Sequence, residues 1–583
     1  MGAAHSGRPV THCAALTMSE DSGVPGAGSG GVGKNSGSSV AATAPASAAT
    51  IPTQQALPRV ERAAAIAIAA VTLAMRAVAF FHYRFDSDEP QHLHVAWGWT
   101  AGLLQYRDLF DNHAPLFHMA AAPLLRLLGE RADILLWMRG PMVLLWLTVT
   151  ACTYAIARRL YDVRIAIWSV VLLNAFPPFF LKSLEFRTDN LWNAFWMLAV
   201  VVLVFGRRST GVFFLAGLLL GCTFSVSLKT PLLLITLAAA WTITYFMRVR
   251  QRGTDIRARH LAAIALGFVI VPSIVAGYFV TRGAWANLVY CVIRFNGLLE
   301  LTRNPLTVWV PRLCFLPLLF LVLRTAWRHR QTSTDNRFFF AAASGVFVVT
   351  LASFWILISP RDFLPFLPFL SIFLVAALAR RRFFLEAVIV LALFSLTGTG
   401  YYAAWLTDRT REFITMENQL LHLSRPGELV MDYKGELIYR RRPYYFILEF
   451  ITRNAIARGL VADTVAEDLI RTGCHIAQAD GAQWPDRART FMSANYIDLG
   501  RLRVSGQWLH PDGTFSIAIP GEYVILNKNG EARGMLDGTP NQRSKTLARG
   551  IHRFVGKNER LACVWAPAYA RGFSPFHLRD LDF

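Results

Sequence analysis

The chain has 583 residues, of which 54% are hydrophobic and only 17% are charged, and its formal net charge is +21 at pH 7. A soluble protein carries about a quarter charged residues, so this composition excludes an ordinary soluble enzyme. The basic balance does not indicate nucleic acid binding, because most arginines stand in short clusters between apolar runs and no basic soluble domain is visible.

Residues 1–58 are predicted to form a disordered cytoplasmic tail. Residues 1–50 are rich in Gly, Ala, Ser and Thr and show no periodic apolar pattern, so they cannot bury a core of their own. They also lack the apolar segment and nearby cleavage site that mark a signal peptide.

Residues 59–405 hold repeated apolar stretches of about 17 to 25 residues, the length that crosses a bilayer as a helix. These stretches are too long and too continuously apolar to be the strands of a membrane barrel. We therefore expect a polytopic α-helical membrane protein with about eleven transmembrane helices. The expected spans lie near residues 63–81, 139–157, 165–181, 190–205, 212–228, 231–247, 261–280, 306–323, 338–358, 363–379 and 383–402.

The arginine clusters predict the orientation of these helices. They fall on alternate loops, near residues 59–62, 158–164, 207–208, 248–259, 324–337 and 380–382, which the positive-inside rule assigns to the cytoplasm. We expect a multi-pass protein of the inner (plasma) membrane, with its N-terminus cytoplasmic and residues 406–583 extracytoplasmic. This assignment requires the short stretches 92–104 and 115–128 to lie along the interface as helices that do not cross.

The chain becomes soluble in character after about residue 405. "LVMD" and "HIAQA" are predicted to be buried strands, with a helix over 455–470 between them, so we expect an α/β region over 406–510. The stretch "GTFSIAIPGEYVILNKNGEARGMLDG" alternates and breaks at glycines, which predicts a β-rich, sandwich-like region over 511–583. Cys474 and Cys563 lie in these regions, and the sequence leaves open whether they pair.

Three motifs on the predicted outer side carry carboxylates. "FDSDEPQHLHVAWGW" (85–99) follows the first span, "DLFDNHAPLFH" (108–118) comes next, and "KSLEFRTD" (182–189) ends the third span. Ionisable groups at a membrane boundary are costly unless they face water or serve a function. On a helix, Asp88 and Glu89 would share a face with His92, so acid, base and metal-ligand chemistry coincide in the first motif.

These motifs resemble the GT-C glycosyltransferases, in the branch that contains protein O-mannosyltransferases and the transferases that place aminoarabinose on lipid A. The resemblance covers residues 60–405 and rests on the order of the motifs. An Asp-Glu pair follows the first span, "HAPL" stands where relatives have a "KPPL"-like turn, and "RRLYDVRIAIWSVVLLNAFPPFFLKSLEFRTDNL" is similar to the next family block. "SPRDFLPFLPFL" resembles the "RYxxPxxP" segment, with Asp362 in place of tyrosine.

The resemblance implies transfer of one sugar from a polyprenyl-phosphate donor to an extracytoplasmic acceptor, with inversion. Asp88 matches the family's proposed general base and Glu89 its catalytic companion. A carboxylate is a suitable proton acceptor for the attacking hydroxyl, and a single displacement needs no covalent intermediate. His92, Asp111, His113, Glu185 and Asp189 are predicted to lie around the acceptor or to support the site.

The departing lipid phosphate carries negative charge, which cations must meet. The candidates are the basic residues near the outer ends of spans: Lys182, Arg187, Lys229, Arg294 and Arg361. A divalent metal held by Glu89, Asp111 or His113 is also left open, because the sequence contains no closed set of ligands.

Other functions compete with this interpretation. An oligosaccharide transferase or ligase would move a preassembled glycan from a lipid diphosphate. A transporter is less favoured, because transporters place charges near the bilayer midplane and often show repeated halves. The tail is predicted either to cover the active site or to bind acceptor glycan, with Trp484, Trp508, Tyr523 and Trp565 as candidate stacking residues. The sugar and the acceptor (a lipid, polysaccharide or protein) stay open.

Overall fold

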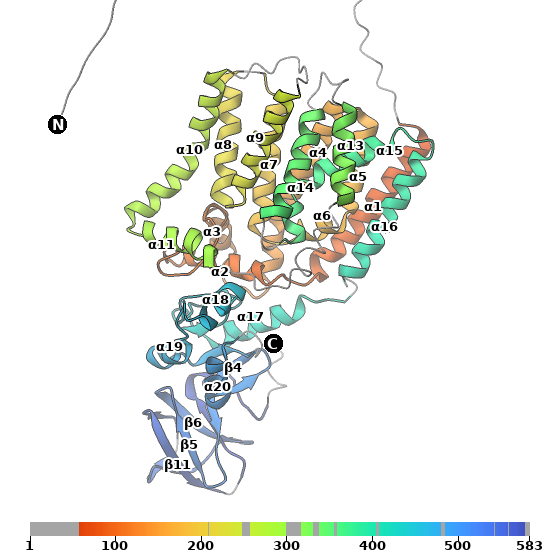
Figure 1. Ribbon diagram of the computed structural model, residues 1–583. Coiled ribbons are helices and arrows are strands. Elements are labelled where there is room, and N and C mark those ends of the chain that lie inside the picture. Colours follow the sequence, from red (N-terminus) through yellow and green to blue (C-terminus); the bar gives the residue numbers. More distant parts are fainter. Residues whose placement is uncertain are drawn as a thin grey trace, which may run out of the picture. The chain divides into compact units, whose positions relative to one another are not determined.

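The computed structural model describes residues 57–207, 209–247, 257–298, 316–329, 337–354, 358–403, 407–479, 484–541, 543–557 and 559–577. The predicted N-terminal tail, the centres of two arginine clusters and part of the expected span 306–323 therefore lie outside the described residues. Within the part from Ala56 onward, Figure 1 shows a bundle of long helices followed by a smaller region that contains the strands.

The helical bundle follows the predicted spans closely. Its long elements are α1 (Arg59–His82), α4 (Ile134–Leu160), α5 (Val163–Ala175), α7 (Thr188–Phe205), α8 (Thr210–Val226), α9 (Thr230–Phe246), α10 (Ala258–Thr281), α13 (Leu316–His329), α14 (Arg337–Phe354), α15 (Leu367–Leu378) and α16 (Phe384–Ala403). Within the described ranges, five helices are long and apolar enough to cross a membrane, namely α1, α4, α7, α10 and α16, and several shorter apolar helices accompany them.

One expected span is broken in two. The stretch predicted over 165–181 forms α5 and a separate short helix, α6 (Pro177–Lys182). The break falls at Phe176, whose backbone is extended (φ −63°, ψ 123°) and which precedes two prolines. The residue before a proline is pushed out of the helical region by steric clash, so the chain turns here and carries the 182–189 motif across the bundle end.

The segment between α1 and α4 forms the two short helices that the topology required. They are α2 (Asp88–Thr100) and α3 (Leu116–Leu128). Helix α2 begins four residues earlier than the predicted 92–104. Asp88 and Glu89 in its first turn are favoured there by the positive end of the helix dipole. Pro90 is also compatible with the first turn, where its missing N–H group is not needed. The early start places both carboxylates at the helix N-terminus.

Helices α8 and α10 pack with their backbones in direct contact. A Cβ atom on Gly217 would lie 2.2 Å from the carbonyl oxygen of Ile264, and one on Gly221 would lie 2.4 Å from that of Phe268. A Cβ atom on Gly267 of α10 would likewise lie 2.2 Å from the carbonyl oxygen of Phe214. Small residues four apart permit this approach between membrane helices.

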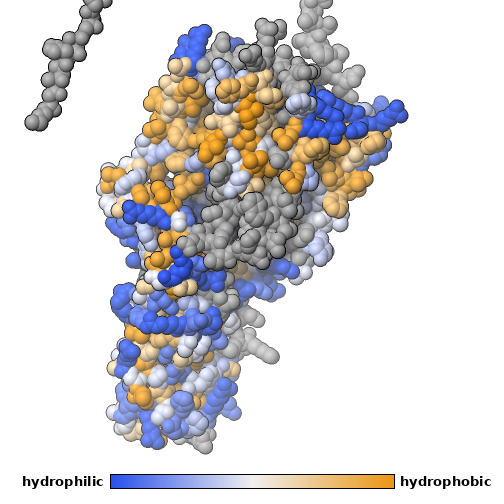
Figure 2. All heavy atoms as spheres, viewed as in Figure 1, coloured by the Kyte–Doolittle hydropathy of each residue, from blue (hydrophilic) through white to orange (hydrophobic). Residues whose placement is uncertain are grey.

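The surface agrees with a membrane location for the bundle. Figure 2 shows hydrophobic side chains gathered over the helices of the face in view, whereas the strand region is mostly hydrophilic. Large apolar side chains such as Ile274, 66% exposed, and Phe394, 75% exposed, point outward from α10 and α16. Exposed apolar surface on this scale is expected where lipid is the solvent.

The C-terminal region begins with α17 (Arg411–Leu423) and contains two sheets. An eight-stranded sheet has the order β1-β2-β4-β12-β6-β10, with β3 on β4 and β7 on β6, and a four-stranded sheet has the order β5-β11-β8-β9. The strands are β1 (Val430–Met431), β2 (Ile476–Gln478), β3 (Tyr496–Leu499), β4 (Leu502–Trp508), β5 (Thr514–Ile517), β6 (Gly521–Asn527), β7 (Gly530–Glu531), β8 (Gly534–Leu536), β9 (Thr539–Asn541), β10 (Lys545–Leu547), β11 (Gly550–Gly556) and β12 (Ala562–Trp565).

The larger sheet contains strands from both sides of residue 510, the predicted boundary between the two soluble regions. The predicted strands "LVMD" and "HIAQA" are β1 and β2, which pair in parallel, and β12 lies between β4 and β6. The predicted helix over 455–470 is instead two helices, α18 (Phe450–Ala457) and α19 (Val465–Thr472), because Gly459 at φ +70° ends the first. Helix α20 (Asp486–Asn495) and α21 (Ala566–Ala570) complete the region.

The two cysteines whose pairing was left open, and most of the candidate sugar-stacking residues, lie in the core of this region. Cys474 and Cys563 are both buried and unpaired. Trp484, Tyr523 and Trp565 are also buried, so these three do not form an exposed stacking platform.

Gly217→Ala is expected to destabilise the protein by about 1–3 kcal/mol, because the added methyl group forces α8 away from α10. Thermal unfolding of the purified protein in detergent, followed by tryptophan fluorescence, measures the change. Gly277→Ala on α10 is the matched control, since a Cβ there meets nothing within 4 Å. Equal melting temperatures for the two variants would contradict the close packing.

Candidate active site

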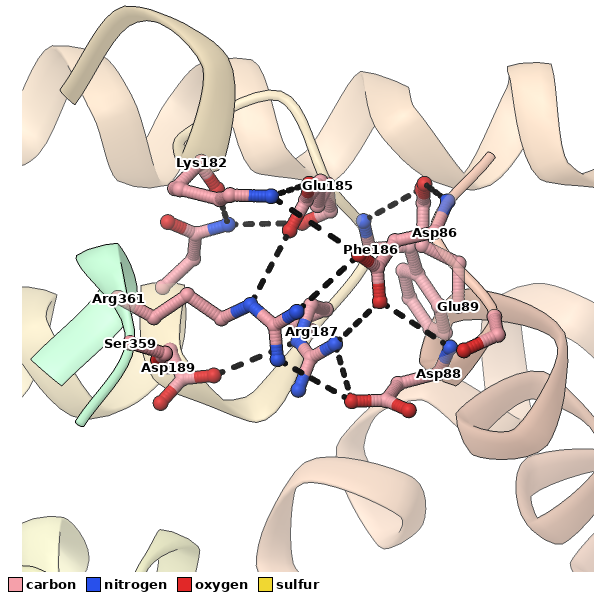
Figure 3. A network of polar contacts seen from close by, with 12 residues as sticks. Asp86, Asp88, Glu89, Lys182, Glu185, Phe186, Arg187, Asp189, Ser359 and Arg361 are labelled. Carbon is pink, nitrogen blue, oxygen red and sulfur yellow. Dashed lines mark hydrogen bonds and ion pairs between the residues drawn. The ribbon is translucent and has the colours of Figure 1, made fainter. Parts of the chain in front are cut away.

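A network of acidic and basic side chains lies where α2, the α6–α7 loop and the 3-10 helix η3 (Pro360–Phe363) meet, as Figure 3 shows. Asp86 and Asp88 come from the start of α2, Glu185 and Arg187 from the α6–α7 loop, and Arg361 from η3. The sequence motifs 85–99, 182–189 and 359–362, which are far apart in the chain, are thus brought together.

Asp88 sits among three cations. Its Oδ2 accepts from Arg361 Nη1 at 3.2 Å and also contacts Arg187 Nη1, while Oδ1 contacts the ammonium group of Lys434. Burial favours the neutral acid, but Arg187, Lys434 and Arg361 outweigh it and hold the pKa of Asp88 well below its usual range. Asp88 is therefore ionised and able to accept a proton, but is a weak base while all three cations remain in place.

Asp86, which the sequence analysis did not single out, belongs to the same network and is less exposed than Asp88. Its Oδ1 accepts from Arg187 Nη1 at 2.6 Å and its Oδ2 from Arg361 Nη2 at 3.1 Å. Burial raises its pKa, but Arg187 and Arg361 more than compensate and lower it overall. Asp86 and Asp88 therefore clamp the same two guanidinium groups.

Glu89 is fully buried and has no free acceptor position. Arg139 of α4 binds both its oxygens, with Nη2 3.1 Å from Oε1 and Nε 3.3 Å from Oε2. The backbone N–H of Asp86 donates to Oε1 at 2.8 Å and that of Phe186 donates to Oε2 at 2.9 Å. Glu89 thus ties α2, α4 and the α6–α7 loop together, which is the arrangement of a positioning residue.

Glu185 lies behind the two arginines. It contacts the ammonium group of Lys182, and Arg361 Nε is 3.7 Å from its Oε2. Burial raises the pKa of Glu185 to about 7, since the pull of Lys182 in the other direction is offset by the negative charge of Asp86. This carboxyl group is thus poised between its two protonation states at neutral pH.

A second chain of charges extends from Arg187 toward α9. Asp189 Oδ2 is 3.4 Å from Arg187 Nε, and its Oδ1 accepts from Lys229 Nζ at 2.8 Å. Lys229 also contacts Asp362 Oδ1 at 2.6 Å. Asp189 and Asp362 are therefore both counter-ions of Lys229.

The predicted residues His92, Asp111 and His113 form a largely buried cluster with His118 next to this network. His113 Nδ1 lies 2.9 Å from Asp111 Oδ1, and His92 Nδ1 lies 3.0 Å from Nε2 of His118. Gln105 donates to Asp111 Oδ2 at 2.7 Å. Burial, reinforced by His113 and His118, holds the pKa of His92 well below its usual range, so His92 is neutral.

The structure brings two of the three residues that the sequence left open as metal ligands into contact. Asp111 and His113 are in contact, but the oxygens of Glu89 are taken by Arg139 and backbone donors. Within the described ranges, no group of three or more His, Cys, Asp or Glu side chains is arranged to hold a metal ion. In this structure the three side chains are engaged in hydrogen bonds and ion pairs, and metal binding stays a prediction from the sequence.

Arg294 lies apart from the network. It ends the π-helix η1 (Tyr290–Arg294), where its side chain is exposed. Among the described residues, the carboxylates around Asp88 contact Lys182, Arg187, Arg361 and Lys434, but not Arg294. Lys434, from the soluble region, was missed by the sequence analysis, because nothing in its local pattern distinguishes it from a solvated lysine.

A cavity of about 530 Å³ lies at the C-terminal end of α2, between α2, α3 and residues 426–441. Trp97, Glu130, Tyr439 and Arg441 are among its lining residues, and none of the carboxylates around Asp88 lines it. The cavity is therefore distinct from the charged network, although both adjoin α2.

Comparison with known proteins confirms the predicted resemblance. The family described as dolichyl-phosphate-mannose-protein mannosyltransferase matches residues 112–240. The chain has the GT-C fold. ArnT of Cupriavidus metallidurans bound to undecaprenyl phosphate superposes with a TM-score of 0.55 and 14% identity, over 76% of this chain and 97% of that chain.

The apo state of the same ArnT superposes similarly, with a TM-score of 0.53 and 14% identity, over 76% of this chain and 98% of that chain. An Archaeoglobus fulgidus oligosaccharyltransferase tethered with an acceptor peptide is more distant, at a TM-score of 0.42 and 11% identity over 77% of this chain and 73% of that chain. No curated protein matches the sequence.

Arg139→Met is expected to destabilise the protein by about 3–5 kcal/mol, because it leaves the carboxylate of Glu89 buried without its counter-charge. The double variant Glu89→Met/Arg139→Met should recover part of this loss, since no charge then remains uncompensated. Thermal unfolding of both variants in detergent gives the coupling between the two residues. If the stability losses of Glu89→Met and Arg139→Met simply added up in the double variant, the pairing would be contradicted.

Proposed function

We propose that this protein is a membrane glycosyltransferase that transfers a sugar from a polyprenyl-phosphate donor to a hydroxyl group of an extracytoplasmic acceptor, with inversion. One observation carries the proposal: an ionised carboxylate, Asp88, lies in direct contact with Arg187 and Arg361 at the end of a helical bundle. A proton acceptor and a phosphate-binding pair are thereby adjacent, on a fold shared with an enzyme whose structure holds undecaprenyl phosphate.

The proposed reaction is a single displacement. The acceptor oxygen forms a bond to the anomeric carbon as the bond from that carbon to the phosphate oxygen breaks. The electron pair of the broken bond stays on the phosphate, and the proton of the acceptor hydroxyl passes to Asp88. Arg187 and Arg361 stabilise the charge that develops on the phosphate, since charge-assisted hydrogen bonds act strongly in a site shielded from water.

The two charge changes compensate each other. Asp88 loses its negative charge on accepting the proton at the same time as the departing phosphate gains one. The arginines that neutralise Asp88 in the resting site can therefore turn toward the phosphate without a net change of charge in the cluster. This exchange explains why the base is surrounded by cations that lower its resting pKa.

The roles proposed for Lys182, Lys229 and the two histidines rest on their contacts. Lys182 lies 3.8 Å from Asp86 and holds Glu185, while Lys229 holds Asp189. These side chains are expected to keep the two arginines oriented rather than to contact the acceptor. His113 and His92 line the neighbouring cluster and are proposed to border the acceptor, whose class stays open.

Asp88→Asn is expected to lower turnover about 100- to 10,000-fold, the usual contribution of a general base. The assay follows a radiolabelled sugar from purified undecaprenyl-phosphate-linked donors to envelope acceptors. Asp108→Asn is the control, because Asp108 lies in the same segment and pairs with the exposed Arg107. Turnover near that of the wild type for Asp88→Asn would remove Asp88 as the base.

The pH profile of kcat/KM is expected to lack an inflection from Asp88 near neutral pH. The pKa of Asp88 is lowered, so its basic form persists as the pH falls and is lost only below the ordinary carboxyl range of about 4. Activity measured from pH 4 to 8 tests this. An inflection near pH 7 that Glu185→Gln abolishes would instead assign the proton transfer to Glu185, whose pKa is about 7.

A further inference from the structure

Lys434 belongs to the C-terminal region, but its side chain reaches into the charged network around Asp88. It lies in the segment between β1 and α18, and its ammonium group contacts Asp88 Oδ1. The same nitrogen lies 3.4 Å from Ser87 Oγ and 4.0 Å from Glu449 Oε2. Its side chain is 15% exposed, so the charge has been withdrawn from bulk water to meet Asp88.

The turn that carries Lys434 is organised by a buried carboxylate. Asp432 accepts hydrogen bonds from the backbone N–H groups of Gly435 and Leu437, both at 2.8 Å, and lies 3.4 Å from Arg442. Gly435 has φ +91°, a conformation that favours glycine. The turn is therefore fixed before any ligand binds.

The turn also packs directly on α2. A Cβ on Gly435 would lie 3.0 Å from that of His94, and the His94 ring nitrogen Nδ1 lies 2.8 Å from the carbonyl oxygen of Ile438. Burial lowers the pKa of His94 to about 4, so the neutral ring donates this hydrogen bond. Next along the chain, Tyr439 donates to the backbone oxygen of Arg131 at 3.0 Å. These contacts fix the position of Lys434 relative to the helix that bears Asp88.

Lys434 is charged in this position. Burial opposes its charge, but Asp88 and Glu449 overcome the effect and raise the pKa of its ammonium group. Lys434 is the third cation that contacts Asp88, after Arg187 and Arg361. Among the described residues, it is the only one of these three that comes from outside the helical bundle. A phosphate that reaches Arg187 and Arg361 thus comes within the reach of a flexible lysine side chain.

We propose that Lys434 is a catalytic residue contributed by the C-terminal region, which moves from Asp88 to the donor phosphate and so frees Asp88 to accept the acceptor's proton. This inference rests on the proposed function. Lys434 binds the phosphate as the bond to the anomeric carbon breaks and the electron pair remains on phosphate oxygen. The C-terminal region is then part of the active site rather than a separate module.

The test uses the full-length protein and undecaprenyl phosphate, the expected leaving group, as a probe that needs no turnover. Lys434→Met is expected to weaken binding of undecaprenyl phosphate about 10- to 100-fold, the range for a lost charge-assisted hydrogen bond. Lys434→Arg should retain most of the binding, because it keeps the positive charge. Lys528→Met is the matched control, since Lys528 is an exposed lysine of the same region.

Turnover provides a second measurement. Lys434→Met should reduce kcat as well as raise the KM for donor, and should shift the acid limb of kcat/KM to higher pH, because Asp88 then has one cation fewer. A purely structural role would lower the melting temperature and leave this limb in place. Tighter probe binding or faster turnover in Lys434→Met would show that Lys434 blocks the site, which overturns the proposal.

The outcomes separate this inference from the proposed function. Binding and turnover of Lys434→Met equal to those of Lys528→Met, with Asp88→Asn inactive, would overturn the role of Lys434 alone. A wild-type protein that binds no undecaprenyl phosphate and transfers no sugar would overturn the proposed function itself.

Discussion

The candidate site depends on one constraint: each of its buried carboxylates and cations must be neutralised by a group of opposite charge. Isolated charges in such a place would carry a large desolvation cost, so each needs a partner. The carboxylates Asp86, Asp88, Glu89, Glu185, Asp189 and Asp362 are matched by the cations Arg139, Lys182, Arg187, Lys229, Arg361 and Lys434. Two of these pairs, Lys182–Glu185 and Arg187–Asp189, lie within one segment. The partners of Asp86, Asp88, Glu89 and Asp362 come from other segments, so these four carboxylates gain their counter-charges only when the segments pack together.

The same constraint shapes the proposed chemistry. A base surrounded by cations is ionised at every physiological pH but has little affinity for a proton until those cations find another partner. A phosphate group is such a partner, so arrival of the donor and activation of the base become one event.

The sequence was informative where the signal is local. Apolar length predicted most of the longer helices between α1 and α16, and clustered ionisable residues at Asp88 and Glu185 pointed to the candidate site. Pairings between distant residues could not be predicted in this way. Glu89 was expected beside Asp88 as a reactive group, whereas its environment is set by Arg139, 50 positions away. Lys434 lies 346 positions from Asp88, and no periodicity records that contact.

The order of strands in the larger sheet has a consequence for how the protein is made. Strand β1, which leads directly to the turn of Lys434, pairs with β2, β2 pairs with β4, and β4 pairs with β12. A strand synthesised long after Lys434 therefore lies in the middle of the sheet that supports it. The turn gains its full support only once β12 has been synthesised and has entered the sheet, so the position of Lys434 is secured late in the folding of the chain. The candidate site is therefore expected to become complete only after the last strand of the chain has been made.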